Sequence, residues 1–293
     1  MHQKSDVLWL SVSPFLKCFD QRLLGQLTRG NTIRRWQYCQ TIDEPCSVTD
    51  VVKSLHEYLK SRAPADPSHP YPKVHLMGHG VSGIIGLLYT RQYPDYVASL
   101  TLLSVSDQPA INWQAHYYAL RHLLPCSREI ILGQMTRLLF GQQAPRFTKA
   151  LSQLLSKDLD SNITLHSIAH KTQIPSGGVD VPLLVCNGEI DDITGTQPAL
   201  NWHKQLKEGD RYWQCPEGNH FFHFQQYKET AKVIADYWAE LPKPLSMSSM
   251  GDRIETRSTT PTMQASSQKL TPPKQPSEQY YQTHHSFIAN HLN

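Results

Sequence analysis

The 293-residue sequence has no long apolar run and little net charge, and each absence excludes a class of protein. No run approaches the roughly 20 apolar residues that a membrane-spanning helix needs, and no charged-then-apolar segment typical of a secretion signal follows Met1. The formal net charge of +3 indicates neither a nucleic-acid partner nor an anionic membrane surface. We therefore predict a cytoplasmic protein that has no membrane span and no nucleic-acid partner.

The sequence also has few cysteines, and none of their spacings is that of a metal site. The six are Cys18, Cys39, Cys46, Cys126, Cys186 and Cys215. They form no CxxC pair, which favours reduced thiols. His220 and His223 are three residues apart, but no Glu completes the HExxH pattern of a zinc hydrolase. We predict no metal and no cofactor.

Apolar strand patterns alternate with helical patterns along most of the chain, which is typical of a parallel sheet with crossover helices. Strands are predicted at residues 7–12, 32–38, 74–77, 97–105, 181–186 and 211–214. Helical spacing fills the intervals, most clearly at 51–59, 81–91 and 227–241. The expected fold class is therefore α/β, with six mostly parallel strands.

Two segments depart from this alternation. Residues 107–173 hold only helical patterns, at 113–124, 128–140 and 147–155. Residues 242–293 contain six of the twenty prolines and eight serines but few large aliphatic side chains, a composition that cannot bury enough apolar surface to fold. We predict an α/β core over residues 1–106 and 174–241, a separate helical region over 107–173, and a disordered tail over 242–293.

Three turns of the chain carry a resemblance to a known family. Residues 74–83 read VHLMGHGVSG, a strand that runs into a sharp turn, and this resembles the Gly-x-Ser-x-Gly nucleophile elbow of the α/β-hydrolase family. The sequence NGEIDD at 187–192 is similar to the family's Gly-x-x-Asp turn. The sequence GNH at 218–220 is similar to its Gly-His turn, with one extra residue. The resemblance covers residues 7 to about 241.

This resemblance implies both a fold and a set of site positions. The implied fold is a six-stranded sheet of α/β-hydrolase type, without the family's first two strands, and with residues 107–173 as a helical cap. The implied positions are Asp191 for the acid, His220 for the base and Gly80 for the nucleophile. The N–H of Val81 is the implied oxyanion donor. From the residues alone, Asp191 is also consistent with a turn or helix cap, and His220 with a surface loop.

The chain departs from the family where the chemistry is most demanding. Gly80 occupies the nucleophile position and has no side chain to form an acyl-enzyme. Ser82 replaces the third elbow glycine, which puts a Cβ where strand and helix are expected to pack closely. Ser11-Val12-Ser13-Pro14 replaces the His-Gly pair that usually shapes the oxyanion hole. Ser82 and Ser13 remain as alternative, relocated nucleophiles or as binding residues.

These departures favour a non-catalytic hydrolase homologue, that is, a binding or scaffolding pseudoenzyme. One alternative is a cofactor-independent hydrolase or lyase that uses the Asp191–His220 pair as a general base. A second alternative is an esterase with a relocated serine. The partners predicted are a small apolar ligand under the cap and a protein that docks on the tail, whose aromatic residues gather at 280–288.

Overall fold

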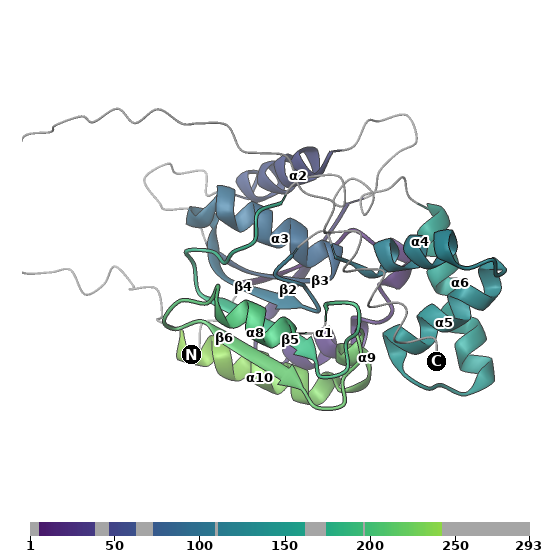
Figure 1. Cartoon of the computed structure of the whole chain (residues 1–293). Helices are drawn as coiled ribbons and strands as arrows, with labels where there is room; N and C mark the ends of the chain where they lie inside the picture. The colour runs from purple at the N-terminus through teal and green to yellow at the C-terminus, as the bar shows by residue number, and fades with distance from the viewer. Residues whose placement is uncertain are drawn as a thin grey trace, which may run out of the picture. The chain divides into compact units, whose positions relative to one another are not determined.

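Six parallel strands form the central sheet of the protein (Figure 1). The computed structural model describes residues 6–38, 47–62, 73–108, 111–161, 174–195 and 197–241. The strands are β1 (Asp6–Ser11), β2 (Thr32–Gln37), β3 (Val74–His79), β4 (Val97–Leu103), β5 (Leu183–Gly188) and β6 (Arg211–Cys215). Their order is β2–β1–β3–β4–β5–β6, and every adjacent pair is parallel. The predicted α/β class and six-stranded parallel sheet are confirmed.

The central strands are buried on both faces because helices cover the sheet on both sides. Leu76, Leu100 and Leu183 are fully buried in β3, β4 and β5. The edge strand β2 is largely exposed or half-buried along its length. This difference explains why the central strands read as continuous apolar runs, whereas residues 32–38 are more polar.

Helices cover both faces of the sheet, and the helices on each face contribute residues to a separate hydrophobic core cluster (Figure 1). One cluster contains Leu55 of α2 (Val48–Lys60), Ile85 of α3 (Val81–Gln92) and Trp202 of α8 (Pro198–His203). The other contains residues of α1 (Gln21–Leu27) and α10 (Tyr227–Glu240). Short helical turns are also present at η1 (Pro14–Leu16), η2 (Pro94–Tyr96) and α9 (Phe222–Gln225).

Three helices follow β4 and pack on one another beside one end of the sheet (Figure 1). They are α4 (Trp113–Leu123), α5 (Arg128–Phe140) and α6 (Pro145–Ser161). The third helix is longer than the predicted 147–155, because Leu151, Leu155 and Leu159 keep one face buried along its length. Residues 162–173 of the predicted cap lie outside the described residues.

Several predicted boundaries were wrong by a few residues. Strand β4 ends at Leu103 rather than at 105, because Ser104 has a φ of 49° and breaks the extended backbone. Helix α2 covers Val48–Lys60, whereas the predicted helix covers only 51–59. The predicted disordered tail, residues 242–293, lies outside the described residues. Within the described ranges, no helix is long and apolar enough to cross a membrane.

The first turn of α3 lies directly against the end of β3. A Cβ at Gly78 would meet the backbone N of Gly83 at 2.6 Å and the carbonyl carbon of Ser82 at 2.7 Å. A Cβ at Gly83 would meet Cγ2 of Val105 at 2.5 Å. The close contact therefore rests on Gly78 and Gly83, and the Cβ of Ser82 is accommodated where the sequence predicted crowding.

This contact predicts that Gly78→Ala destabilises the protein strongly, because the new methyl group meets backbone atoms that cannot move aside. We expect the free energy of unfolding to fall by about 1–3 kcal/mol, the usual cost of overpacking, as measured by urea denaturation. Gly133→Ala in α5 is the matched control, since its Cβ would have no neighbour within 4 Å. The control should gain about 0.5–1 kcal/mol from the better helix former. Equal effects at the two positions would contradict the close contact.

Candidate functional site

The turn between β3 and α3 keeps the shape of a nucleophile elbow although it ends on glycine. Gly80 has a φ of 52° and a ψ of −125°, a backbone conformation that costs an L-residue about 1–3 kcal/mol and glycine little. Its N–H donates to the carbonyl of Leu103 at 3.0 Å, and its carbonyl accepts from Ile84 at 3.0 Å. The elbow is thus fixed between a neighbouring strand and its own helix.

Backbone hydrogen bonds join the turn that follows β5 to the turn that follows β6. The N–H of Glu189 donates to the carbonyl of Cys215 at 3.0 Å, and the N–H of Ile190 donates to that of Gly218 at 2.9 Å. A Cβ at Gly188 would lie only 2.1 Å from the carbonyl oxygen of Gly218, so only glycine fits there. This contact sets the distance between the turn that carries Asp191 and the turn that carries His220.

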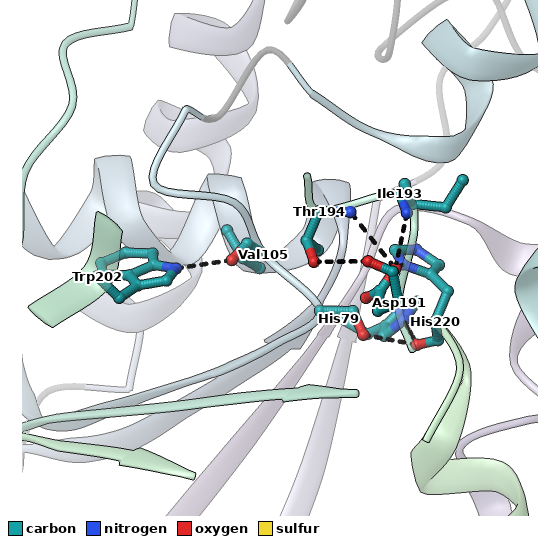
Figure 2. A network of polar contacts seen from close by, with 8 residues as sticks. His79, Val105, Asp191, Ile193, Thr194, Trp202 and His220 are labelled. Carbon is teal, nitrogen blue, oxygen red and sulfur yellow. Dashed lines mark hydrogen bonds and ion pairs between the residues drawn. The ribbon is translucent and has the colours of Figure 1, made fainter. Parts of the chain in front are cut away.

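Asp191 and His220 form a buried hydrogen-bonded pair (Figure 2). His220 Nδ1 lies 3.1 Å from each carboxylate oxygen of Asp191, and the two residues are 1% and 4% exposed. Because a carboxylate only accepts, Nδ1 carries the proton in the neutral ring and Nε2 keeps its lone pair. His220 is therefore oriented as a general base would be.

The Asp191 carboxylate is stabilised in its charged form. Its Oδ1 also accepts from the backbone N–H groups of Ile193 at 3.0 Å and Thr194 at 3.4 Å (Figure 2). Burial alone would raise the pKa of this carboxyl. Attraction to His220 and the hydrogen bonds outweigh burial, so the pKa of Asp191 lies below its ordinary value.

His220 faces Gly80, the position that the resemblance assigns to the nucleophile. The nearest heavy atom to a Cβ placed on Gly80 is Nε2 of His220, at 3.9 Å. That nitrogen is buried and has no hydrogen-bond partner. The structure thus brings together the three positions that the resemblance implied, and it leaves the imidazole lone pair aimed at the space above Gly80.

The two candidate relocated nucleophiles have different surroundings. The hydroxyl oxygen of Ser82 accepts from the N–H of Val12 at 3.1 Å, so Ser82 closes the loop that replaces the family's His-Gly pair. Ser13 and Val81 both line a small cavity above the elbow. The Val12 N–H is directed at Ser82 and not at the space above Gly80, which leaves Val81 as the expected backbone donor there.

His79, which precedes Gly80, is a site residue that sequence reasoning missed. Its Nε2–H donates to the backbone carbonyl of His220 at 3.0 Å (Figure 2). Its ring centroid lies 4.8 Å from that of His220 and 4.6 Å from that of His223. Burial, together with the nearness of His223 and His220, holds the pKa of His79 well below its ordinary value. His79 is therefore neutral at pH 7 and supports the His220 backbone.

A second Asp–His pair adjoins the first and was also missed. His223 Nε2 lies 3.4 Å from Oδ1 of Asp20, and Nε1 of Trp9 donates to Oδ2 at 3.0 Å. The ring of His223 is fully buried, and its Nδ1 has no partner. Asp20 and His223 are 203 residues apart in the chain, so no local motif signals the pair.

The cavity above the elbow has a volume of about 30 Å³. It lies at the carboxyl ends of β1 and β3, where the strand order reverses, which is the usual ligand position in open α/β sheets. Its wall includes Gly80, Asp20 and, from α4, Gln114. A ligand pocket for a drug-sized molecule is typically about 300–1,000 Å³, so this space admits only about two water-sized groups. Among the described residues, no group of three or more His, Cys, Asp or Glu side chains is arranged to hold a metal ion.

Comparisons with known proteins give two relatives by sequence and many by fold. The chain is 38% identical over 238 residues to "Uncharacterized protein alr2406" of Nostoc sp. strain PCC 7120, covering 81% of this chain and 92% of the relative. It is 40% identical over 241 residues to "Uncharacterized protein sll0249" of Synechocystis sp. strain PCC 6803, covering 82% of this chain and 93% of the relative. No protein-family model matches the sequence.

Solved structures with the same fold include several hydrolases. A thermophilic esterase superposes with a TM-score of 0.58 at 16% identity, over 82% of this chain and 91% of that chain. A membrane phospholipase A superposes with a TM-score of 0.63 at 16% identity, over 82% of this chain and 80% of that chain. The enol-lactonase from Burkholderia xenovorans LB400 superposes with a TM-score of 0.58 at 13% identity, over 82% of this chain and 93% of that chain. At these identities the likeness shows the α/β-hydrolase fold and does not extend to activity.

The buried pair predicts a specific dependence of stability on pH. Asp191→Asn should lower the free energy of unfolding at pH 7 by about 3–5 kcal/mol, as for other broken buried pairs. Because the folded pKa of Asp191 is depressed, its contribution is complete above the unfolded value near 3.8 and is lost as the pH falls through the folded pKa. Urea denaturation between pH 7 and pH 2 would measure both effects.

The exposed Asp180→Asn is the matched control and should change stability by less than about 0.5 kcal/mol at every pH. In Asp191→Asn, the loss of stability below pH 4 should be smaller than in the native chain. If Asp191→Asn lost as much stability below pH 4 as the native chain does, the Asp191 carboxylate would not be stabilised by the fold.

Proposed function

The chain belongs to the family of these two cyanobacterial proteins and has the α/β-hydrolase fold, and we propose that it is a non-catalytic binding protein built on that fold. The observation that carries the proposal is the residue at the elbow. Gly80 adopts the backbone conformation of a catalytic nucleophile but offers no atom that could attack a carbonyl. Removal of the nucleophile from a working triad typically costs about 10⁴–10⁶ in rate.

The surroundings of Gly80 support the same proposal. Acyl transfer needs two N–H donors for the oxyanion, and the N–H of Val12 is already bonded to Ser82. The cavity of about 30 Å³ above the elbow is too small for an ester substrate with a sizeable acyl group. The site therefore suits recognition of a small group better than turnover of a large substrate.

In this proposal helices α4 to α6 act as a cap over the binding site. Trp113 and Gln114 of α4 form part of the cavity wall, together with Ser13 and Phe221 from the core. The ligand enters between the cap and the carboxyl ends of the strands. The proposed protein partner docks on residues 242–293, which lie outside the described residues.

The proposal predicts that a fluorophosphonate probe does not label the native protein, since no activated serine is present. Gly80→Ser should gain labelling, because a Cβ at this position lies 3.9 Å from His220 Nε2 and its hydroxyl would reach that lone pair. Labelling would be measured by in-gel fluorescence and intact mass.

Two controls accompany this experiment. Gly80→Ala adds the Cβ without the hydroxyl and should stay unlabelled, and Gly80→Ser combined with His220→Ala should lose the gained labelling. Labelling of the native chain would contradict the proposal and point to Ser82 or Ser13, which peptide mapping would distinguish.

A second candidate function is favoured by one specific observation. The Nε2 atom of His220 is buried, without a partner, and backed by Asp191. Such a lone pair could take a proton from a water molecule or from a substrate carbon without a covalent intermediate. The chain would then be a cofactor-independent hydrolase or lyase.

Hydrolysis of p-nitrophenyl acetate separates the two candidates. A non-catalytic protein predicts that the native chain, Gly80→Ala and His220→Ala all give the same uncatalysed rate. A general-base enzyme predicts that His220→Ala loses about 10²–10⁴ in rate while Gly80→Ala keeps the activity. An esterase with a relocated serine would instead lose the activity in Ser82→Ala or in Ser13→Ala.

A further inference from the structure

We propose that the cavity above Gly80 binds the primary ammonium group of a small ligand, with Asp20 and Gln114 as its acceptors. This inference rests on the proposed binding function and names the ligand class. It replaces the apolar ligand suggested by the sequence with one that carries a positively charged end.

The first observation is an excess of hydrogen-bond acceptors in the cavity wall. The Asp20 carboxylate faces the cavity, and its two oxygens hold one donor each, from Trp9 at 3.0 Å and His223 at 3.4 Å. A carboxylate offers about four lone-pair positions, so about two remain open. The Oε1 atom of Gln114 is buried in the same wall and has no partner. Each of these groups can accept a further donor.

The second observation is the lack of positive charge in the same wall. Among the described residues that line the cavity, none is Lys or Arg. His79 lines it as a neutral ring whose Nε2–H is committed to the carbonyl of His220. The start of α3 contributes about half a positive charge at Val81, and Asp20, which contacts His223, is the acidic side chain in the wall. The balance favours a cation.

The third observation concerns the shape and character of the space. The rings of Trp9, Trp113 and Phe221 line it, and aromatic faces attract ammonium groups. The volume of about 30 Å³ admits about two water-sized groups. A nitrogen and the one carbon attached to it have that size, whereas a quaternary ammonium group does not fit.

The test uses the full ¹⁵N-labelled chain titrated with methylammonium chloride at constant total chloride. The reporter is the indole N–H signal of Trp9, which donates to Asp20 and is assigned with Trp9→Phe. We expect a saturable shift with a dissociation constant on the order of 10 mM, near the limit for a ligand of two heavy atoms. Methanol, acetate and tetramethylammonium should give no saturable shift.

Asp20→Asn should weaken methylammonium binding at least tenfold, because it keeps the shape and removes the charge. Gln114→Leu should weaken it several-fold, and it carries the test if Asp20→Asn does not fold. Asp180→Asn, which is exposed and outside the cavity wall, is the control and should bind as the native chain does.

Three results would overturn the inference: a saturable shift with acetate instead of methylammonium, no saturable shift with any probe, or unchanged affinity in both Asp20→Asn and Gln114→Leu. Acetate binding would mean that the start of α3 sets the charge preference. The fluorophosphonate experiment tests for a nucleophile and does not depend on the ammonium site. Failure of the methylammonium titration therefore overturns the ligand class alone.

Discussion

The close contact between β3 and the first turn of α3 is the constraint on which the rest of the site depends. Gly78 and Gly83 allow backbone to touch backbone, and this contact leaves the chain between them only a sharp turn. Gly80, at the tip of that turn, is forced to a positive φ, and the N-terminal end of α3 is directed at the space above it. A catalytic serine would have to bear this strain, whereas glycine relieves it. The elbow is therefore less strained with glycine at this position than it would be with serine.

The retention of Asp191 and His220 has a physical explanation that does not require catalysis. Loss of either partner leaves a buried group uncompensated, at a cost of about 3–5 kcal/mol. The orphaned Nε2 of His220 costs less, about 1–3 kcal/mol. Removing either member of the pair therefore costs more stability than leaving Nε2 of His220 without a partner costs. An intact acid–base pair is weak support for activity.

Much of the fold and part of the site could be predicted from the sequence. The central strands were found because burial on both faces makes them continuous apolar runs. The turns of Asp191 and His220 were found because each follows a strand in the chain order of a known motif. The ends of elements were missed where one residue decides them, as Ser104 does through its positive φ at the end of β4.

The contacts made across the sheet could not be predicted. Asp20 meets His223, and Val12 meets Ser82, only after strands from distant parts of the chain lie side by side. Periodicity and spacing report neighbours within one element, so they carry no signal for such pairs. Ser82 shows the consequence: its Cβ was expected to crowd the elbow, yet it is accommodated, and its hydroxyl accepts from the N–H of Val12 in the loop after β1.

The long separation between the partners of the site also constrains how the protein is made. Asp20 and His223 are 203 residues apart, and His79 and His220 are 141 residues apart. A ribosome releases the chain from the N-terminus, so the elbow is synthesised well before the histidines that cover it. Contacts of such long sequence separation slow folding, because the entropy of loop closure is lost before the contact forms. The surroundings of Gly80 are therefore complete only after the last part of the chain has joined the sheet.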